Sequence, residues 1–264
     1  MGWITSEHTV RFSGWHDLFK LHQKTGKFKG QVSLIHWDPW YQEHKQPERA
    51  DFVKMAEASC YYASPYCVMI VWTPWQSTTK FSEAFVNTGK WHLSNALQVL
   101  LRKRNRIGRY GATGVKKNVT DYHMVLYHIG GDKAASSYTF NMTAVNAIYG
   151  DPSKNHTING GYRWPSNIIL DYIPPTSRTR LKDDDGTALR PQAEKSVWYM
   201  RLLLAAYTKP QQVVYDGMAG TFSMSLACCI TGRKSIACEH EVDVFKHVSP
   251  ASLVSLSFMS FATL

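Results

Sequence analysis

Residues 213–223 read VVYDGMAGTFS, a short apolar segment that runs into small residues and then into a helix-forming stretch. Gly217 and Gly220 allow a ligand to approach the backbone closely, because glycine has no Cβ atom. The helix expected after these glycines presents backbone N–H groups to an anion at its N-terminus. The next expected strand, residues 234–238, ends at Glu239, where a carboxylate can accept both hydroxyls of a ribose. The stretch predicts a nucleotide-like ligand at a sheet edge, with an ordinary glycine-containing turn as the alternative.

A second motif follows another apolar run. Residues 31–37 are typical of a strand buried in a parallel sheet, and they end abruptly in Asp38, Pro39, Trp40 and Tyr41. A carboxylate, a rigid turn and two large aromatic side chains then follow the strand, and such aromatics can stack on a planar base. The alternative is a proline-containing turn whose aromatic side chains cover the end of the sheet.

Strand-like and helix-like segments alternate along the chain, which predicts an α/β fold with a mostly parallel sheet. We expect strands at residues 8–13, 31–37, 65–72, 122–128, 212–215 and 234–238, and helices at residues 14–24, 47–62, 80–87, 194–207 and 223–231. An apolar stretch at residues 92–101 is not assigned to either class. Residues 131–190 are polar and rich in Ser, Thr, Asn, Gly and Pro, which indicates a long insertion rather than core.

The charge balance indicates a polyanionic partner. The 264 residues include 30 Lys and Arg against 20 Asp and Glu, a net charge of +10. A surplus of this size is typical of nucleic-acid-binding proteins, and a merely soluble basic protein is the alternative. Basic residues interleaved with glycines predict a phosphate-contacting loop, and its members are Arg102, Lys103, Arg104, Arg106, Arg109, Lys116 and Lys117.

Several classes of protein are not expected. The apolar runs are too short to span a bilayer, and the N-terminus lacks the pattern of a signal peptide. The five cysteines include no C-x-x-C pair and no histidine at zinc-ligand spacing, so no metal site is predicted. They indicate reduced, mostly buried thiols. We therefore expect an intracellular protein, cytoplasmic or nuclear, that is neither secreted nor bound to a membrane.

The order of the motifs resembles the permuted β-class of S-adenosylmethionine-dependent DNA amino-methyltransferases, the N6-adenine/N4-cytosine type with a D-P-P-Y/W motif. That family carries its catalytic motif near the N-terminus, a target-recognition region in the middle, and a K-P-type motif followed by a D-P-F-x-G-S/T-G loop near the C-terminus. The corresponding segments here are residues 38–41, the basic and polar middle, Lys195, and residues 216–223. The resemblance covers nearly the whole chain.

The resemblance implies a single methyltransferase domain over residues 1–264. Its fold would be Rossmann-like and circularly permuted, with helices on both faces of a mostly parallel sheet. Residues 102–190 would include the basic loop and the target-recognition insertion.

The resemblance also implies N6-adenine methylation of DNA with S-adenosyl-L-methionine as the cofactor and the target base flipped out of the duplex. Asp38 and the Pro39 carbonyl would accept hydrogen bonds from the exocyclic amine, Tyr41 would stack on the base, and Trp40 would shape the pocket wall. The cofactor-binding residues would be Lys195, Asp216, Gly217, Ala219, Gly220, Thr221 and Glu239.

The chain departs from the family pattern at several positions. Trp40 replaces the second proline of the catalytic motif, Phe222 replaces the last glycine of the cofactor loop, and Ser196 replaces the proline after the lysine. Gly217 and Met218 stand where the family has Pro-Phe. The departures leave open a catalytically silent nucleic-acid-binding subunit. An RNA N6-adenine enzyme and a DNA N4-cytosine enzyme are open alternatives as well. A homodimer and a subunit of a heteromeric assembly are both open as well.

Overall fold

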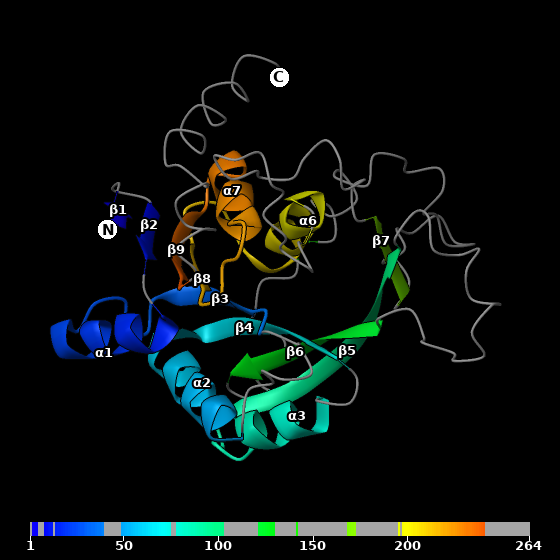
Figure 1. Ribbon diagram of the computed structural model, residues 1–264, viewed down its shortest axis with the longest axis horizontal. Helices are drawn as coiled ribbons and strands as arrows, with labels where there is room; N and C mark the ends of the chain where they lie inside the picture. Colours follow the sequence, from blue (N-terminus) through cyan, green and yellow to red (C-terminus); the bar gives the residue numbers. More distant parts are fainter. Residues whose placement is uncertain are drawn as a thin grey trace, which may run out of the picture.

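The computed structural model describes residues 2–4, 8–12, 14–39, 49–74, 78–102, 121–129, 141, 168–172, 195 and 197–240. Helices and strands alternate through much of this part of the chain (Figure 1). The strands are β1 (Gly2–Ile4), β2 (His8–Phe12), β3 (Val32–Trp37), β4 (Ala63–Pro74), β5 (Trp91–Arg102), β6 (Asp121–Ile129), β7 (Ile168–Tyr172), β8 (Val213–Asp216) and β9 (Lys234–Glu239). The helices are α1 (Trp15–Thr25), α2 (Arg49–Tyr62), α3 (Thr78–Val86), α6 (Val197–Tyr207) and α7 (Ser223–Ile230).

The described strands form one nine-stranded sheet in the order β1-β2-β9-β8-β3-β4-β6-β5-β7. Its centre is parallel, because β2 pairs with β9, β9 with β8, β8 with β3, and β3 with β4 in the same direction. Strand β6 runs antiparallel to both β4 and β5, and β7 is parallel to β5. The predicted α/β class with a mostly parallel sheet is confirmed.

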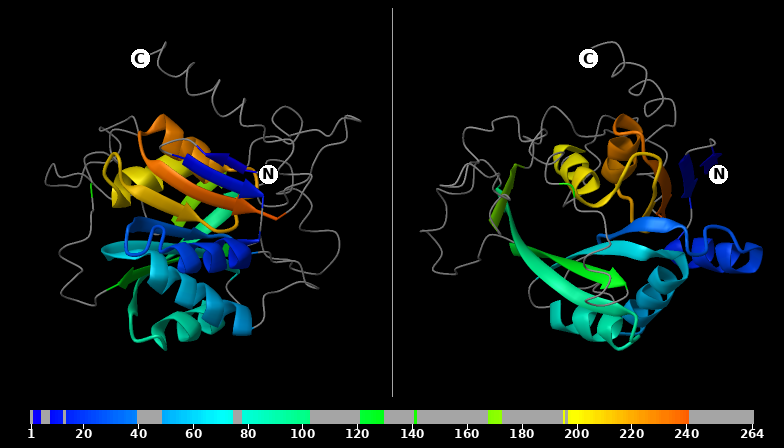
Figure 2. Two further views of the ribbon diagram at one scale, coloured as in Figure 1. Left: turned by 90° about the vertical axis from the view of Figure 1, so that its left-hand side faces the viewer. Right: turned by 180° about the vertical axis from the view of Figure 1, so that it is seen from behind.

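Helices cover both faces of the sheet (Figures 1 and 2). Helices α1, α2 and α3 lie on one face, and α6 and α7 lie on the other. Strand β3 contributes to both packed layers: Ile35 and Trp37 belong to the core under α1–α3, whereas Leu34 belongs to the core under α6 and α7. Burial on both faces explains why the sequence of β3 is a nearly continuous apolar run.

Each predicted strand and helix is present, with ends that differ by a few residues from the expected ones. The unassigned apolar stretch at residues 92–101 is part of β5. Two strands were not predicted, β1 and β7. Strand β7 lies inside the segment expected to be an insertion, and its residues pair with the second half of β5. The segment at residues 131–190, expected to lie outside the core, therefore contributes one strand to the sheet.

Candidate active site

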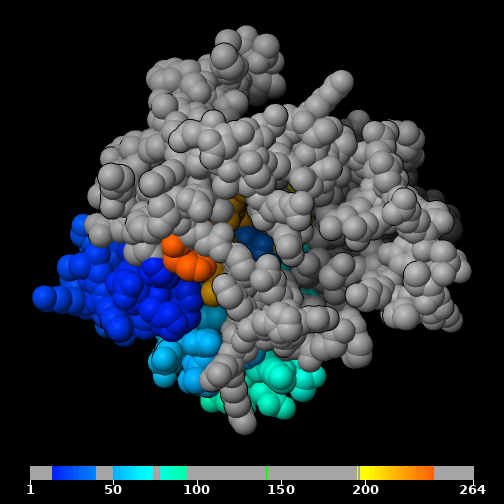
Figure 3. Space-filling view, in the orientation of Figure 1, coloured from blue at the N-terminus to red at the C-terminus, as the bar shows by residue number. Residues whose placement is uncertain are grey.

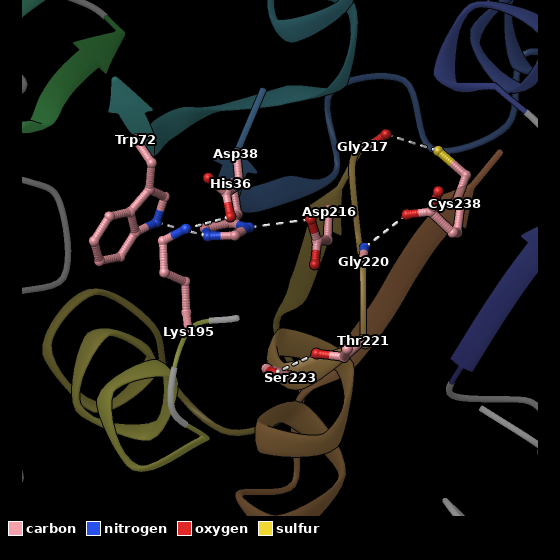
Figure 4. Close-up of polar contacts among 11 residues, drawn as sticks. His36, Asp38, Trp72, Lys195, Asp216, Gly217, Gly220, Thr221, Ser223 and Cys238 are labelled. Carbon is pink, nitrogen blue, oxygen red and sulfur yellow. Dashed lines mark hydrogen bonds and ion pairs between the residues drawn. The ribbon is translucent and has the colours of Figure 1, made fainter. Parts of the chain in front are cut away.

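Three parallel strands bring the predicted site residues to one edge of the sheet. In the register of β3, β8 and β9, His36 lies beside Asp216, and Asp216 lies beside Ala237. Asp38 comes directly after the end of β3, two residues beyond His36, and Glu239 ends β9, two residues beyond Ala237. Both therefore lie at the edge where Asp216 leads from β8 into the glycine loop. Figure 4 shows His36, Asp38 and Asp216 close together at this edge. The two sequence motifs therefore follow the carboxyl ends of neighbouring parallel strands.

Asp38 forms an ion pair with Lys195. The ammonium Nζ lies 2.5 Å from Oδ2 of Asp38, and the Lys195 side chain is 3% exposed whereas that of Asp38 is 19% exposed. The same Nζ lies 4.8 Å from the centroid of the Trp72 ring, on the adjoining strand β4. A cation over an aromatic face is attracted by the ring quadrupole, so this contact adds to the ion pair in holding the lysine. Lys195, predicted to bind the cofactor, thus makes a direct contact with the predicted catalytic carboxylate.

The glycine loop begins against the ring of a core tryptophan. A Cβ atom built on Gly217 would lie 2.2 Å from Cζ3 of Trp37. Trp37 is fully buried, and its indole Nε1 donates a hydrogen bond to Ser59 Oγ at 2.9 Å. Because the ring is fixed from behind, glycine at position 217 is a packing requirement. Further along, Gly220 has a φ of +51°, in the left-handed region that favours glycine.

Phe222 keeps a glycine-like backbone where the family pattern has glycine. Its φ is 59° and its ψ is 27°, and it is the N-cap of helix α7. Its N–H donates to the Ala219 carbonyl at 2.8 Å, and its own carbonyl accepts from the N–H of Leu226 at 2.9 Å. The left-handed conformation disfavours a residue with a Cβ by about 1–2 kcal/mol. The ring is fully buried, and burial of an aromatic side chain offsets that strain.

The end of β9 holds the loop in place. Oε2 of Glu239 accepts the N–H of Gly220 at 2.7 Å, and Oε1 accepts the N–H of His240 at 2.8 Å. The Cys238 carbonyl accepts the N–H of Ala219 at 3.0 Å. In Figure 3 the orange atoms, from the region where β9 ends, are visible beside the blue atoms of the region of α1. Glu239 thus has a structural contact with the loop that the sequence did not predict, in addition to its predicted role in ribose binding.

Helix α7 begins directly after the loop. Its first backbone N–H groups have no acceptor inside the helix, which makes the N-terminus favourable for a negatively charged group. Two hydroxyls lie at this end, since Thr221 Oγ1 is 3.1 Å from Ser223 Oγ. The loop therefore combines close backbone approach at its glycines with donors suited to a ligand carboxylate.

His36 is a buried polar residue on β3 that sequence reasoning missed. Its Nδ1 lies 3.0 Å from Oδ1 of Asp216, and its Nε2 accepts a hydrogen bond from the indole Nε1 of Trp72 at 2.9 Å (Figure 4). His36 is 4% exposed, Asp216 1% and Trp72 0%. The available signal was a single histidine inside an apolar run next to the catalytic motif. Its partners are too distant in sequence for spacing to reveal them.

The cysteines among the described residues are free thiols. Burial raises the pKa of Cys67, Cys228 and Cys238 well above the usual value, so these groups stay protonated near neutral pH. The Cys238 thiol donates to the Gly217 carbonyl at 3.2 Å, which is a further contact between β9 and the loop. Because the thiolate is the reactive form, these three side chains have a structural rather than a chemical role.

Other predicted site residues lie outside the described part of the chain. These are Trp40, Tyr41, Lys103, Arg104, Arg106, Arg109, Lys116 and Lys117. Arg102 is the last residue of β5, and Pro39 is buried directly after Asp38. The described residues include no group of three or more His, Cys, Asp or Glu side chains arranged to hold a metal ion. Among the described helices, none has the length and apolar character that a membrane span requires.

Comparisons with known proteins identify the fold. No family model and no curated protein sequence matches the chain. The solved structure of M1.HpyAVI in complex with SAM has a TM-score of 0.61 at 16% identity, covering 91% of this chain and 96% of that one. PvuII DNA methyltransferase (cytosine-N4-specific) has a TM-score of 0.68 at 12% identity, covering 98% and 94%. TTHA0409 from Thermus thermophilus, complexed with S-adenosyl-L-methionine, has a TM-score of 0.60 at 10% identity, covering 98% and 97%. The chain therefore shares a methyltransferase fold over nearly its full length.

Proposed function

We propose that the protein is an S-adenosylmethionine-dependent DNA amino-methyltransferase that modifies N6 of adenine. The observation that carries this proposal is the position of Asp38 at the same sheet edge as the loop between Asp216 and Phe222. A carboxylate suited to an exocyclic amine lies there beside a loop suited to a nucleotide-like methyl donor. The fold shared with M1.HpyAVI and PvuII DNA methyltransferase supports the assignment to DNA methyltransferases, without distinguishing the target base.

The residues around the loop fit S-adenosylmethionine. Among the described residues, no atom lies within 4 Å of where a Cβ of Gly220 would be, so the backbone there is open to a ligand. The Glu239 carboxylate at the end of β9 is an acceptor with about four lone-pair sites, which suits it to ribose hydroxyls. The N-terminus of α7 suits the donor's carboxylate, and the Asp216 carboxylate suits its ammonium. Ala219 and Thr221 complete the proposed donor-binding loop.

Asp38 and Pro39 act on the acceptor. An exocyclic amine on adenine is a poor nucleophile because its lone pair is delocalised into the ring. The Asp38 carboxylate and the Pro39 carbonyl accept the two amine hydrogens and draw the nitrogen toward tetrahedral geometry. When bound, S-adenosylmethionine supplies a methyl group activated by a sulfonium centre. The protein's contribution is then mainly to place the amine in line with that methyl group.

Lys195 fixes the carboxylate of Asp38. Its ammonium group donates to Oδ2 and leaves acceptor capacity on Asp38, because a carboxylate offers about four lone-pair sites. The lysine is itself fixed over the Trp72 ring. We assign Lys195 the role of orienting and pairing the catalytic carboxylate, and the cofactor contact that the family resemblance implies is the alternative role.

The substrate assignment rests on the sequence. A base must leave its duplex to reach the site, at an energetic cost of a few kcal/mol, and stacking on Tyr41 beside Trp40 offsets much of it at about 1–3 kcal/mol per base. The basic residues between Arg102 and Lys117 would contact phosphates. Residues 102–190 would carry target recognition within a single domain.

The proposed permutation of the chain is supported by the place of β8, which lies between β9 and β3 inside the sheet although it comes late in the sequence.

DNA N4-cytosine methylation is the second candidate. Its support is the solved structure with the TM-score of 0.68, which belongs to an enzyme described as cytosine-N4-specific. The acidic first residue of the catalytic motif, Asp38, is the feature that favours adenine by resemblance. RNA methylation and a silent subunit are the remaining alternatives, and both give a different result in the assay below.

The deciding experiment is methyl transfer from labelled S-adenosylmethionine to DNA and RNA oligonucleotides, followed by nucleoside analysis. We expect N6-methyladenine in DNA. Asp38→Asn is the matched control, because it keeps the size of the side chain and removes its charge. This variant should bind the donor as the wild type does and transfer methyl groups more slowly, because Asn keeps one acceptor oxygen but loses the charge that pairs with Lys195. Asp38→Ala, which lacks the acceptor, should transfer none.

The alternatives predict different products. N4-methylcytosine in DNA would support the second candidate, and N6-methyladenine in RNA alone would move the assignment to RNA. Donor binding without transfer to either nucleic acid would support the silent subunit. An Asp38→Ala variant with full activity would overturn the proposed catalytic site.

A further inference from the structure

We propose that His36 is the positioning residue that fixes the donor loop to the catalytic strand through Asp216. This inference rests on the proposed function and extends it to a residue with no assigned role. His36 lies on β3 two positions before Asp38, and its side chain contacts the first residue of the donor loop. It therefore connects the acceptor side of the site with the donor side.

The hydrogen bonds define the protonation of the His36 ring. An indole N–H can only donate, so Nε2 of His36, 2.9 Å from Nε1 of Trp72, is an acceptor and carries no proton. The neutral imidazole then carries its proton on Nδ1, which donates to Oδ1 of Asp216 at 3.0 Å. Trp72 thus selects the tautomer that His36 needs in order to hold the carboxylate.

The backbone of His36 holds the next residue of the same loop. The N–H of Gly217 donates to the His36 carbonyl at 3.4 Å. The neighbouring residue, Trp37, packs its ring against Gly217 from the opposite face of the sheet. Side chain, carbonyl and adjoining ring together fix the start of the loop, while the following residue, Asp38, carries the proposed chemistry.

Burial makes the contact necessary. Asp216 is 1% exposed, and a carboxylate removed from water requires hydrogen-bond donors. A neutral imidazole supplies one hydrogen-bond donor in a fixed direction, and it places no second full charge beside the proposed S-adenosylmethionine site. Hydrogen bonds to charged groups are the stronger class, so loss of this one should let the Asp216 carboxylate and the loop move.

The first test measures donor binding by calorimetry with S-adenosylmethionine and S-adenosylhomocysteine. His36→Phe keeps an aromatic ring but removes the Nδ1 hydrogen-bond donor. We expect the Kd for S-adenosylmethionine to rise on the order of 10-fold to 100-fold. His36→Asn places an amide nitrogen near the position of Nδ1 and should recover much of the affinity. The effect should fall on the KM for the donor, with the KM for the oligonucleotide unchanged. A role in folding alone would not produce this split or this rescue.

A double-mutant cycle isolates the contact. If His36 acts through Asp216, His36→Phe should weaken donor binding in the wild type and should have little further effect in an Asp216→Asn background. Equal effects in both backgrounds would overturn the proposal.

A second measurement does not depend on a folded His36 variant. A long-range proton–nitrogen NMR spectrum of the wild type should show one histidine with a protonated Nδ1 and an unprotonated Nε2 near neutral pH. Trp72→Phe should shift the signal of His36 and leave that of His22, the other buried histidine among the described residues, unchanged. A signal for His36 with the proton on Nε2 would overturn the proposal.

The outcomes separate the two levels of inference. A wild type that does not bind S-adenosylmethionine overturns the proposed function and the positioning role with it. A wild type that binds, together with a folded His36→Phe variant of equal affinity, overturns the positioning role alone.

Discussion

The ring of Trp37 occupies the space that a side chain on Gly217 would need. Three ring atoms lie 2.2, 2.7 and 2.9 Å from the position of a Cβ on Gly217, and a hydrogen bond to Ser59 holds the ring there. Strand β3 and the loop that follows β8 are therefore packed in direct contact. The departure from the family pattern at position 217 follows from this tryptophan, because no larger residue fits beside it.

Replacement of Gly217 tests this contact. Gly217→Ala should lower the free energy of unfolding by about 1–3 kcal/mol, the usual effect of overpacking, and should weaken donor binding because the loop must shift. The measurements are chemical denaturation and calorimetry. In the Gly217→Ala background, Trp37→Phe removes the clashing ring atoms and should restore part of the binding. A stable Gly217→Ala variant with normal affinity would contradict the packing account.

Lys195→Met tests whether this lysine acts on the target base, through Asp38, or on S-adenosylmethionine. It removes the cation that pairs with Asp38 and keeps the length of the side chain. We expect kcat to fall about 100-fold to 1,000-fold, the usual effect of removing one hydrogen-bond donor that stabilises charge in an active site, with affinity for S-adenosylmethionine nearly unchanged. Steady-state kinetics and calorimetry check this. A large loss of donor affinity with kcat preserved would instead support the cofactor role implied by resemblance.

Glu239→Ala should weaken binding of S-adenosylmethionine. Loss of a charged acceptor costs roughly 1.5–3 kcal/mol, which is about 10-fold to 100-fold in Kd by calorimetry. The structure adds a second cause, because Oε2 also accepts the N–H of Gly220. Glu239→Gln keeps one acceptor oxygen and should show a smaller loss. Wild-type affinity in Glu239→Ala would mean that the ribose site is placed wrongly.

The basic segment gives a prediction about salt. Each phosphate contact contributes about 0.9 to the slope of log K against log salt concentration. Replacement of four of its members with serine, namely Arg104, Arg106, Arg109 and Lys116, should lower that slope by about 3–4 if each residue contacts one phosphate. Titration of a labelled oligonucleotide at several salt concentrations measures it. An unchanged slope would identify the segment as an ordinary solvated surface.

Local patterns were sufficient for much of the fold. Strand β3 was visible as an apolar run because both of its faces are buried, and the glycine loop was visible because a turn with close backbone contacts requires small residues. Parallel strands place their carboxyl ends together, so the meeting of Asp38 with Asp216 followed from topology.

Contacts between distant residues could not be predicted in this way. Lys195 and Asp38 are 157 positions apart, and His36 and Asp216 are 180 apart, so no spacing rule relates them. Strand β7 was missed for a similar reason. Its pairing with β5 supplies the hydrogen bonds that make it a strand, and its surroundings in sequence are polar.

Phe222 offers a test in which glycine should outperform alanine. Removal of its buried ring costs about 3–5 kcal/mol in Phe222→Ala, and the left-handed backbone strain remains. Phe222→Gly loses the same ring but relieves that strain, so it should be more stable than Phe222→Ala by about 1 kcal/mol in chemical denaturation. The matched control is Phe81, which is equally buried but lies within helix α3. At that position Phe81→Ala should be more stable than Phe81→Gly by about 1 kcal/mol, because glycine is unfavourable in the interior of a helix. If alanine were the more stable replacement at both positions, the left-handed backbone conformation of Phe222 would be contradicted.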